Sequence, residues 1–369
     1  MKEMTDRSGG FYSAQDADSE GVEGKYYVFT PEEIKKVLGD EDGETFSRFY
    51  DITEKGNFEG NSIPNLIGNI KFEDWDARPH EWCRALYEYR LKRTKLHKDD
   101  KILTSWNALM IAALAKAYRA TGRKKYLTFA ENALKFIENS LTDSSFRIRV
   151  RYREGEAKGL GFLDDYAFMA WACIELYEAT YDIVFLTRSL HYAKQINKLF
   201  RDPAGGYFLY GEDNEQLISR PKETYDGAIP SGNSVAGYVL TRLRLMTGQQ
   251  ELLDEEQLEF LASGLSNYPA GYTMALMAGM QRVYPTKELM CVIHSYEDLE
   301  LFKEKMRTVF MPNLTVLVKA EDNDEQLGAI SKFTKDYTSK GKSAYYICEN
   351  HACSEPVYDL EELVKRLKS

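Results

Sequence analysis

The stretch DDKILTSWNALMIAALAKAYRATG, Asp99 to Gly122, contains a segment that carries no charge on any side of a helix. Every residue of this segment, Ala108 to Ala115, is apolar, and a helix that is apolar on every face is buried. Three later segments share this character: Tyr166 to Ile174 (YAFMAWACI), Val235 to Leu240 (VAGYVL) and Met274 to Met280 (MALMAGM). The sequence therefore predicts four buried helices.

Amphipathic segments lie between the buried ones. Arg123 to Leu141 and Asp182 to Phe200 carry Lys and Glu residues that mark one face of each helix as solvated. A buried helix followed by a half-exposed helix, repeated with short turns such as ATG at Ala120 to Gly122, is typical of an α/α toroid. We therefore expect a mainly α fold with an inner ring of buried helices and an outer layer of amphipathic ones.

Acidic residues gather in YSAQDADSEGVEGKYYVF, Tyr12 to Phe29. Asp16, Asp18 and Glu20 match the opening of an EF-hand calcium loop, but the twelfth position, which requires Glu, is Tyr27. The flanks FYSAQ and KYYVF suggest strands, so a β-hairpin with an acidic tip is expected. We expect this tip to lean towards the toroid mouth, where its three carboxylates would bind ligand hydroxyls; a solvated loop is the alternative.

A second hairpin echoes the first, because DRSGGFYSA at Asp6 recurs as DPAGGYFLY at Asp202. The Gly pair supplies the unusual backbone angles needed where a helix hands over to a strand. We expect both hairpins where outer helices return to inner ones. The capping box Thr30-Pro31-Glu32-Glu33 predicts a short helix that runs to about Leu38.

The pattern changes near Lys287, where apolar strands begin to alternate with helices. Such alternation predicts a small parallel sheet in a separate α/β module. The expected elements are strands at 289–294, 314–319 and 343–348, helices at 296–309 and 324–337, and a last helix after Asp359. We therefore divide the chain into a partial toroid with β-hairpin insertions, residues 1–286, and a small α/β module, residues 287–369.

Composition narrows the classes of partner. The formal net charge of −10 and the lack of a Lys/Arg cluster disfavour nucleic acid, which needs a basic surface. No stretch is apolar enough for a signal peptide or a membrane span, so we expect a cytoplasmic protein.

Cys348 and Cys353 flank His351 in CENHAC, but zinc needs four ligands, so two ordinary thiols are favoured. Neither a metal nor a cofactor is expected.

Several long motifs stand in one order: YSAQDADSEGVEGKYYVF, DDKILTSWNALMIAALAKAYRATG, GFLDDYAFMAWACIELYEAT, DGAIPSGNSVAGYVLTRL and CENHACSEP. With them the chain closely resembles the YyaL and spermatogenesis-associated protein 20 family. The resemblance implies a thioredoxin-like N-terminal domain followed by a six-hairpin α/α toroid, of the kind found in glycosidases and in N-acylglucosamine and cellobiose 2-epimerases.

The chain departs from the family in its length. In the family the DADSEG hairpin lies near the middle of the chain, whereas here Asp16 follows Met1 closely. The resemblance thus implies the C-terminal half only, an incomplete toroid that lacks the thioredoxin-like domain and the first hairpins. We expect either a truncated remnant or a chain whose missing part comes from a thioredoxin-like partner chain.

A sugar site in such a toroid would lie at the mouth, where the inner helices begin, with aromatic rings for stacking and carboxylates for proton transfer. The candidate catalytic residues are Asp164, Asp165 and Asp226. The candidate binding residues are Trp106, Asn107, Tyr166, Ser231, Asn233 and Tyr272, together with Asp16, Asp18 and Glu20.

Each candidate also has a structural alternative. One of Asp164 and Asp165 is expected to cap its helix, because adjacent residues at a helix start diverge in direction. Asn107 and Asn233 would bind hydroxyls or cap their helices, and Trp106 would stack on a sugar or belong to the core. None of the five histidines falls at an inner-helix opening, which disfavours a histidine-based epimerase.

Two classes of function therefore stay open. One is a carbohydrate-binding or carbohydrate-processing protein, glycosidase-like or epimerase-like, with carboxylates at the toroid mouth. The other is a non-catalytic scaffold or truncated remnant that partners a thioredoxin-like domain. The first predicts that Asp165 and Asp226 face one cavity, with carboxyl groups within roughly 5–10 Å of each other.

Overall fold

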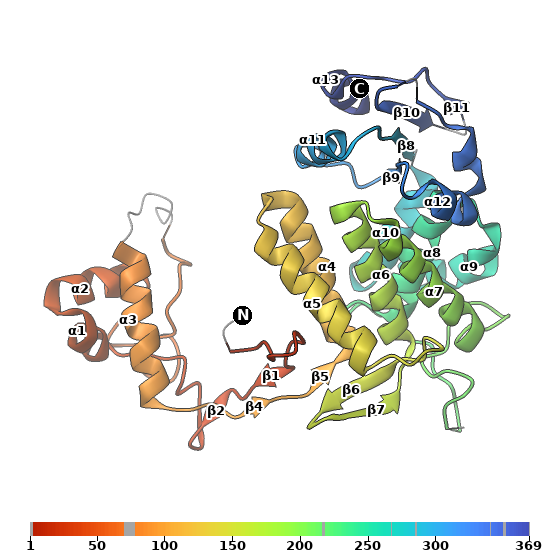
Figure 1. Ribbon diagram of the computed structural model, residues 1–369. Coiled ribbons are helices and arrows are strands. Elements are labelled where there is room, and N and C mark those ends of the chain that lie inside the picture. The colour runs from red at the N-terminus through yellow and green to blue at the C-terminus, as the bar shows by residue number, and fades with distance from the viewer. Residues whose placement is uncertain are drawn as a thin grey trace. The chain divides into compact units, whose positions relative to one another are not determined.

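The computed structural model describes residues 3–69, 78–215, 218–266, 268–284, 286–339, 341–349 and 352–368. The chain forms two compact units (Figure 1). The larger unit comprises Met1–Phe11 and Lys101–Ser369, and the smaller unit comprises Tyr12–Asp100. We keep the boundary at residue 287 as a proposal about the interior of the larger unit.

Helical hairpins make up most of the larger unit. The inner helices are α4 (Thr104–Thr121), α6 (Leu163–Thr180), α8 (Gly232–Thr247) and α10 (Thr273–Val283). The outer helices are α5 (Lys124–Ser140), α7 (Ile183–Leu199) and α9 (Glu255–Leu265). The short 3-10 helices η2 (Gln250–Leu252) and η3 (Pro269–Gly271) lie in the connections.

The inner helices form one row. Helix α4 packs on α6, α6 on α8 and α8 on α10, while α5 and α7 pack against α4 and α6. Figure 1 shows α4 and α5 side by side at one end of this group of helices. Helix α6 is buried along nearly its whole length, as the uncharged segment Tyr166 to Ile174 at its centre predicts. The predicted mainly α fold, an incomplete α/α toroid, is confirmed.

Three segments that precede inner helices share one local design. Each closes with an isolated antiparallel bridge, and the bridges are Thr5↔Phe11, Thr142↔Ile148 and Arg201↔Tyr207. The first and third contain the Gly pairs of the repeated motif, and Gly9, Gly205 and Gly206 all have positive φ. The repeat noticed in the sequence therefore recurs a third time, in a stretch that lacks the Gly pair.

Each bridge is also fastened to the inner helix that follows it. Asn107 accepts a hydrogen bond from the Phe11 N–H at 2.7 Å and donates to the Phe11 carbonyl at 2.9 Å. Asn233 makes the same pair of bonds with Tyr207, again at 2.7 and 2.9 Å. In the middle connection the Tyr166 hydroxyl accepts from the Ile148 N–H at 2.8 Å. We call these three contacts the bridge ties.

Two sheets belong to the larger unit. The first has the order β5-β6-β7, is antiparallel and comprises β5 (Ile102–Leu103), β6 (Arg149–Arg153) and β7 (Glu156–Leu160). The second has the order β11-β10-β8-β9 and comprises β8 (Lys287–Val292), β9 (Leu314–Lys319), β10 (Ala344–Glu349) and β11 (Ala352–Cys353). Its helices are α11 (Tyr296–Met306), α12 (Asp324–Ile330), η4 (Lys332–Asp336) and α13 (Leu360–Lys368).

The second sheet is mixed, so the prediction of a parallel sheet is wrong in part. Strands β8 and β9 are parallel, but β10 runs antiparallel to β8. The predicted helix at 324–337 is also two pieces, since α12 ends at Ile330 and the 3-10 helix η4 follows. The module packs on the helical row, where the Val318 N–H donates to the Tyr177 hydroxyl at 3.1 Å.

In the part of the smaller unit that the structure describes, residues 12–69 and 78–100, there are three helices and four short strands. The helices are α1 (Pro31–Leu38), α2 (Asp40–Phe49) and α3 (Arg78–Arg93), and the strands are β1 (Ala14–Gln15), β2 (Asp18–Ser19), β3 (Val22–Glu23) and β4 (Lys98–Asp99). Its core contains Phe29, Ile34, Phe46, Ile52, Trp82 and Leu86. The predicted capping box at Thr30 and Glu33 is confirmed.

The acidic stretch forms a tight hairpin. Strands β2 and β3 pair around Glu20 and Gly21, which both have positive φ. The flank KYYVF was predicted as a strand, and this is wrong: it forms turns, with a single bridge from Phe29 to Ser62. The other flank contributes β1, which pairs with β4.

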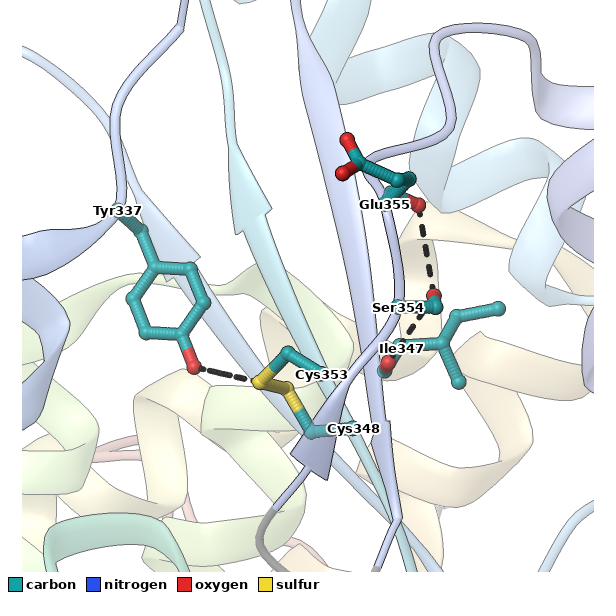
Figure 2. The surroundings of a disulfide bond; sticks show 6 residues. All are labelled: Tyr337, Ile347, Cys348, Cys353, Ser354 and Glu355. Atoms are coloured by element: carbon teal, nitrogen blue, oxygen red, sulfur yellow. Dashed lines mark hydrogen bonds between the residues drawn. A yellow bond between two sulfur atoms is a disulfide. The ribbon is translucent and has the colours of Figure 1, made fainter.

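Cys348 and Cys353 form a disulfide, so the prediction of two ordinary thiols is wrong (Figure 2). The two residues lie directly opposite each other on β10 and β11. The Tyr337 hydroxyl lies 3.0 Å from the Cys353 sulfur. His351, which entered the zinc alternative, lies outside the described residues.

Candidate functional site

The first turn of α6 holds Asp164 and Asp165, which the sequence singled out. Asp165 is buried, with 2% of its surface exposed. One of its carboxylate oxygens accepts from the Phe162 N–H at 2.9 Å and the other from the Ser105 N–H at 2.9 Å. Asp165 therefore caps its own helix and also joins it to the start of α4.

Asp164 is directed to the next inner helix, and the Gly232 N–H at the start of α8 donates to its carboxylate. A Cβ atom at position 232 would collide with Asp164 Oδ1, which explains why Gly stands there in PSGNS. Glu223 is an exposed residue of the loop before α8, and its charge acts on Asp164. Asp164 and Glu223 therefore form a carboxylate pair, which we call the acidic pair.

Asp226 continues this pattern between α8 and α10. Its carboxylate accepts from the Ser231 N–H at 2.9 Å and from the Met274 N–H at 2.7 Å. Each neighbouring pair of inner helices is thus joined at its N-terminal ends by one aspartate. Carboxylates are stabilised there, because the first N–H groups of a helix lack intrahelical partners and the helix dipole is positive.

Burial changes the acidity of the two aspartates on α6. It raises the pKa of Asp165 to about 7, although the N–H groups of Phe162 and Ser105 oppose the change. Burial, together with the charge of Glu223, raises the pKa of Asp164 to about 6. A carboxyl group with a pKa near neutrality can hold and release a proton at physiological pH, as a general acid does.

Aromatic side chains surround these helix starts. Trp106, in the first turn of α4, is 45% exposed, and Tyr225 is 58% exposed. Tyr225 meets the ring of Tyr272 edge to face, with 6.1 Å between ring centroids. Gly271 lies against the rings of Tyr225 and Tyr268, because a Cβ there would come within 2.6 Å of both. Exposed rings of this kind can stack on an apolar sugar face.

Other predicted binding residues have polar groups that are engaged inside the protein. Asn107, Tyr166 and Asn233 make the bridge ties and are all buried. Ser231 caps α8 by accepting from the Ser234 N–H at 3.1 Å. The alternative that the two asparagines cap their helices is wrong, because α4 has no side-chain cap and Ser231 caps α8. Their role as sugar ligands stays a prediction.

Asp16, Asp18 and Glu20 belong to the smaller unit, and the hydrogen bonds and ion pair described for them are made within that unit. Asp16 accepts from the Asp18 N–H at 3.1 Å, which shapes the turn before β2. Glu20 pairs with Lys25, which lowers its pKa. Their proposed contact with a ligand at the toroid mouth stays a prediction.

Sequence reasoning missed Glu223, Tyr225 and Tyr268. The first two stand in KETYDGAIPSGNS, the segment that also holds the predicted Asp226, Ser231 and Asn233. Two further bonds hold this loop in place: the Asp226 N–H donates to the Gly271 carbonyl at 2.8 Å, and Asn233 donates to the Glu223 carbonyl at 2.8 Å. An alternation of polar and aromatic residues just before an inner helix was the available signal.

Among the residues that the structure describes, no group of three or more His, Cys, Asp or Glu side chains is placed to hold a metal ion. None of the helices described is both long and apolar enough to cross a bilayer.

No protein-family model matches the chain. Among curated proteins, spermatogenesis-associated protein 20 of Mus musculus is 29% identical over 413 residues, which cover 99% of this chain and 52% of that protein. The Homo sapiens protein of the same name is 28% identical, with 99% and 53% covered. An uncharacterized Caenorhabditis elegans protein, B0495.5, is 28% identical, with 98% and 55% covered.

Solved structures give distant likenesses. An α-1,6-mannanase variant, GH76A of Salegentibacter, has a TM-score of 0.37 at 13% identity, covering 72% of this chain and 66% of that one. The cellobiose 2-epimerase from Spirochaeta thermophila has a TM-score of 0.35 at 17% identity, covering 46% and 43%. TM-scores of this size do not by themselves establish a shared fold. The sequence comparisons are the firmer finding: the chain is a relative of the spermatogenesis-associated protein 20 proteins and spans about half the length of the curated relatives it matches.

Proposed function

We propose that this chain binds a sugar-like ligand at the N-terminal ends of its inner helices and processes it with carboxylates. One observation carries the proposal: the half-buried Asp164 stands at the N-terminal end of an inner helix, and partial burial and the charge of the exposed Glu223 raise its pKa to about 6. Paired carboxyl groups with different environments are what glycoside chemistry requires. The exposed rings of Trp106 and Tyr225 would supply the stacking surface.

The roles follow from access to solvent. Asp164 would donate a proton to the leaving oxygen of the sugar, and Glu223 would act as the second carboxylate, towards water or the anomeric carbon. Asp165 and Asp226, the other catalytic candidates, would hold the helix starts in place, because their oxygens already accept backbone N–H groups. Asp165 would also keep a proton near Asp164, given its pKa of about 7.

The test combines a ligand screen with matched variants. Monosaccharides and oligosaccharides would be screened by thermal shift, where a ligand at 100 times its Kd adds about 2.7 kcal/mol of stability. For a sugar that binds, Trp106→Ala should weaken binding by about tenfold, or about 1.4 kcal/mol. Asp164→Asn and Glu223→Gln should abolish turnover of a glycoside, whereas Glu259→Gln on the exposed face of α9 should not.

Failure of the screen would remove this proposal. If no sugar shifts the melting temperature, or if Glu259→Gln lowers turnover as much as Glu223→Gln, the acidic pair has no catalytic role.

A non-catalytic scaffold is the second candidate, and one observation favours it: both oxygens of Asp165 and both oxygens of Asp226 accept backbone N–H groups. Aspartates used in this way stabilise helix starts without any ligand. This reading predicts that Asp164→Asn leaves every sugar interaction unchanged. It also predicts a stable complex with a thioredoxin-like chain in analytical ultracentrifugation, and a chain that stays monomeric beside such a partner would contradict it.

A cytoplasmic location is also kept as a proposal. The Cys348–Cys353 disulfide argues against it, because disulfides are rare in cytosolic proteins.

A further inference from the structure

A cavity lies in the larger unit, away from the helix starts that carry the acidic pair. It has a volume of about 450 Å³ and is lined by residues 116 and 118–120 of α4, 178 and 179 of α6, 238 and 242 of α8, and 277, 280 and 281 of α10. Its other wall is formed by the end of α11, the segment 309–313 and the start of β9. A volume of this size suits a small organic ligand.

Charged side chains from three inner helices meet at this cavity. Glu175 is completely buried and lies 2.7 Å from Lys116, 3.2 Å from Arg119 and 3.7 Å from Arg242. Glu178, which is 7% exposed, pairs with Arg119 and Arg242. Three cations therefore face two carboxylates, which leaves one positive charge in excess at the wall of the cavity.

Arg307, at the end of α11, adds a further positive charge. Its guanidinium lies over the Tyr118 ring at 5.4 Å from the centroid and donates to the Tyr118 hydroxyl at 3.5 Å. Both of these partners are neutral, so the guanidinium can pair with an anion that enters the cavity. Lys303, by contrast, pairs with Glu300 at 2.8 Å.

The remaining wall is apolar and adaptable. It includes Met277, Met280, Met306, Met311 and Phe310. Met277 is 42% exposed, Met280 is 44% exposed and Phe310 is 91% exposed. Methionine side chains are flexible and polarizable, and they often line surfaces that accept apolar groups of varied shape.

We propose that this cavity binds an amphiphilic organic anion, whose head pairs with Arg307 and whose apolar body lies on the methionine wall. The proposal is independent of the sugar site, because the two sites share no residue. The excess of cations selects the sign of the head group, and the methionines select an apolar body over a hydrated one.

The first experiment compares four eight-carbon probes with the full chain by isothermal titration calorimetry: octanoate, octyl phosphate, 1-octanol and octyltrimethylammonium. We expect both anions to bind, and the alcohol and the cation to bind at least tenfold more weakly. If octanoate binds better than octyl phosphate, the head group is a carboxylate, and the reverse order indicates a phosphate. The proposal is overturned if neither anion binds, or if 1-octanol binds as tightly as both.

The second experiment changes the cavity wall. Arg307→Met keeps the bulk of the side chain and should weaken octanoate by about tenfold while leaving 1-octanol unchanged. Arg84→Met, at an exposed ion pair with Glu88 on α3, is the matched control and should change neither probe. Thermal unfolding verifies that each variant is folded.

Position 280 provides a test that does not depend on Arg307, because Met280 is 44% exposed and a charge there keeps its contact with water. Met280→Glu should weaken octanoate, and Met280→Lys should strengthen it, each by several-fold. Equal affinities in the two variants would overturn the proposal. Neither variant should alter a sugar interaction at the helix starts, so failure of one proposal is distinguishable from failure of the other.

Discussion

Helix α6 carries two acidic residues near each end, and the two ends differ in the partners of their carboxylates. Asp164 and Asp165 in the first turn accept hydrogen bonds from backbone N–H groups, and burial raises the pKa of both. Glu175 and Glu178 near the last turn pair with Lys and Arg side chains. Burial alone would raise the pKa of Glu175, but Lys116, Arg242 and Arg119 lower it below its ordinary value.

The comparison shows that the partner, and not burial, decides the charge of a buried carboxylate. Backbone N–H groups are partial charges, so they offset only part of the lost hydration. Side-chain cations carry full charges and offset more of it. One end of α6 is therefore suited to exchange protons, and the other end is suited to hold a fixed charge.

The largest expected effect comes from Arg242→Met, because Arg242 is 5% exposed and faces both Glu175 and Glu178. The change leaves Glu175 and Glu178 with the more exposed Lys116 and Arg119 only. The free energy of unfolding should therefore fall by about 3 kcal/mol in urea denaturation, the low end of what breaking a buried ion pair costs. Arg244→Met on the same helix loses hydrogen bonds to Gln250 and Leu253 only, and it should cost about 1 kcal/mol. Equal losses of stability in the two variants would contradict the prediction that the ion pairs of Arg242 with Glu175 and Glu178 stabilise the fold.

At the other end, Asp165→Asn should have a smaller effect. An amide oxygen can accept from one of the two N–H groups, but the NH₂ group cannot accept from the other, so a buried donor is left unpaired. We expect a loss of about 1–3 kcal/mol in the free energy of unfolding. Asp182→Asn at the exposed N-cap of α7 is the control and should stay within about 0.5 kcal/mol, since Asn and Asp cap equally well. No difference between these variants would show that the tie to α4 is dispensable.

The two ends should also respond to pH with opposite signs. The pKa of Asp165 is raised from 3.8 to about 7, so its contribution to stability is complete below pH 3.8 and is lost as the pH rises to 7. Glu175 has a lowered pKa, so its contribution is present above its ordinary value of 4.5 and is lost as the pH falls further. The free energy of unfolding of the wild type should therefore decline as the pH rises from 4 to 7. Asp165 contributes at most about 1.4 kcal/mol per pH unit to this decline.

The Asp165→Asn variant isolates this contribution. Its free energy of unfolding should vary less with pH between 4 and 7 than that of the wild type. Curves that run parallel over this interval would mean that Asp165 does not change its proton there.

The smallest expected effect concerns the acidic pair. Glu223→Gln removes the charge that is the second cause of the raised pKa of Asp164, after burial. The pKa of Asp164 should fall by less than burial raises it, which carbon-detected NMR titration of the carboxyl group can measure. Glu215→Gln, in the same connection, is the control and should leave the titration of Asp164 unchanged. An unchanged pKa in Glu223→Gln would separate the two carboxyl groups and remove the basis of the proposed proton transfer.

Sequence reasoning found the elements whose signal is continuous along the chain. The uncharged segment Ala108 to Ala115 identified α4, although the helix extends from Thr104 to Thr121. It also found the aspartates at the helix starts, because capping residues stand next to the helices that they cap. It did not find what they join, since Ser105 lies 60 residues from Asp165 and Met274 lies 48 residues from Asp226.

The missed features depend on register or on contact between distant segments. The direction of β10 depends on how the chain returns to the sheet and is not encoded in a single strand. The disulfide requires Cys348 and Cys353 to face each other across two strands, which spacing alone does not fix. Glu223 matters only because its charge acts on Asp164, which stands 59 residues earlier in the first turn of α6.

The first bridge tie differs from the others in the length of chain that it spans. Ile148 and Tyr166 are 18 residues apart, and Tyr207 and Asn233 are 26 apart, but Phe11 and Asn107 are separated by 96. The whole smaller unit, Tyr12–Asp100, lies within that interval. The smaller unit is therefore an insertion within one repeat of the larger unit. The hydrogen bonds between Phe11 and Asn107 join the two segments of the larger unit that flank this insertion. The helices of the row, α4 to α10, all lie outside this interval, so their packing on one another is built from residues that the insertion does not supply.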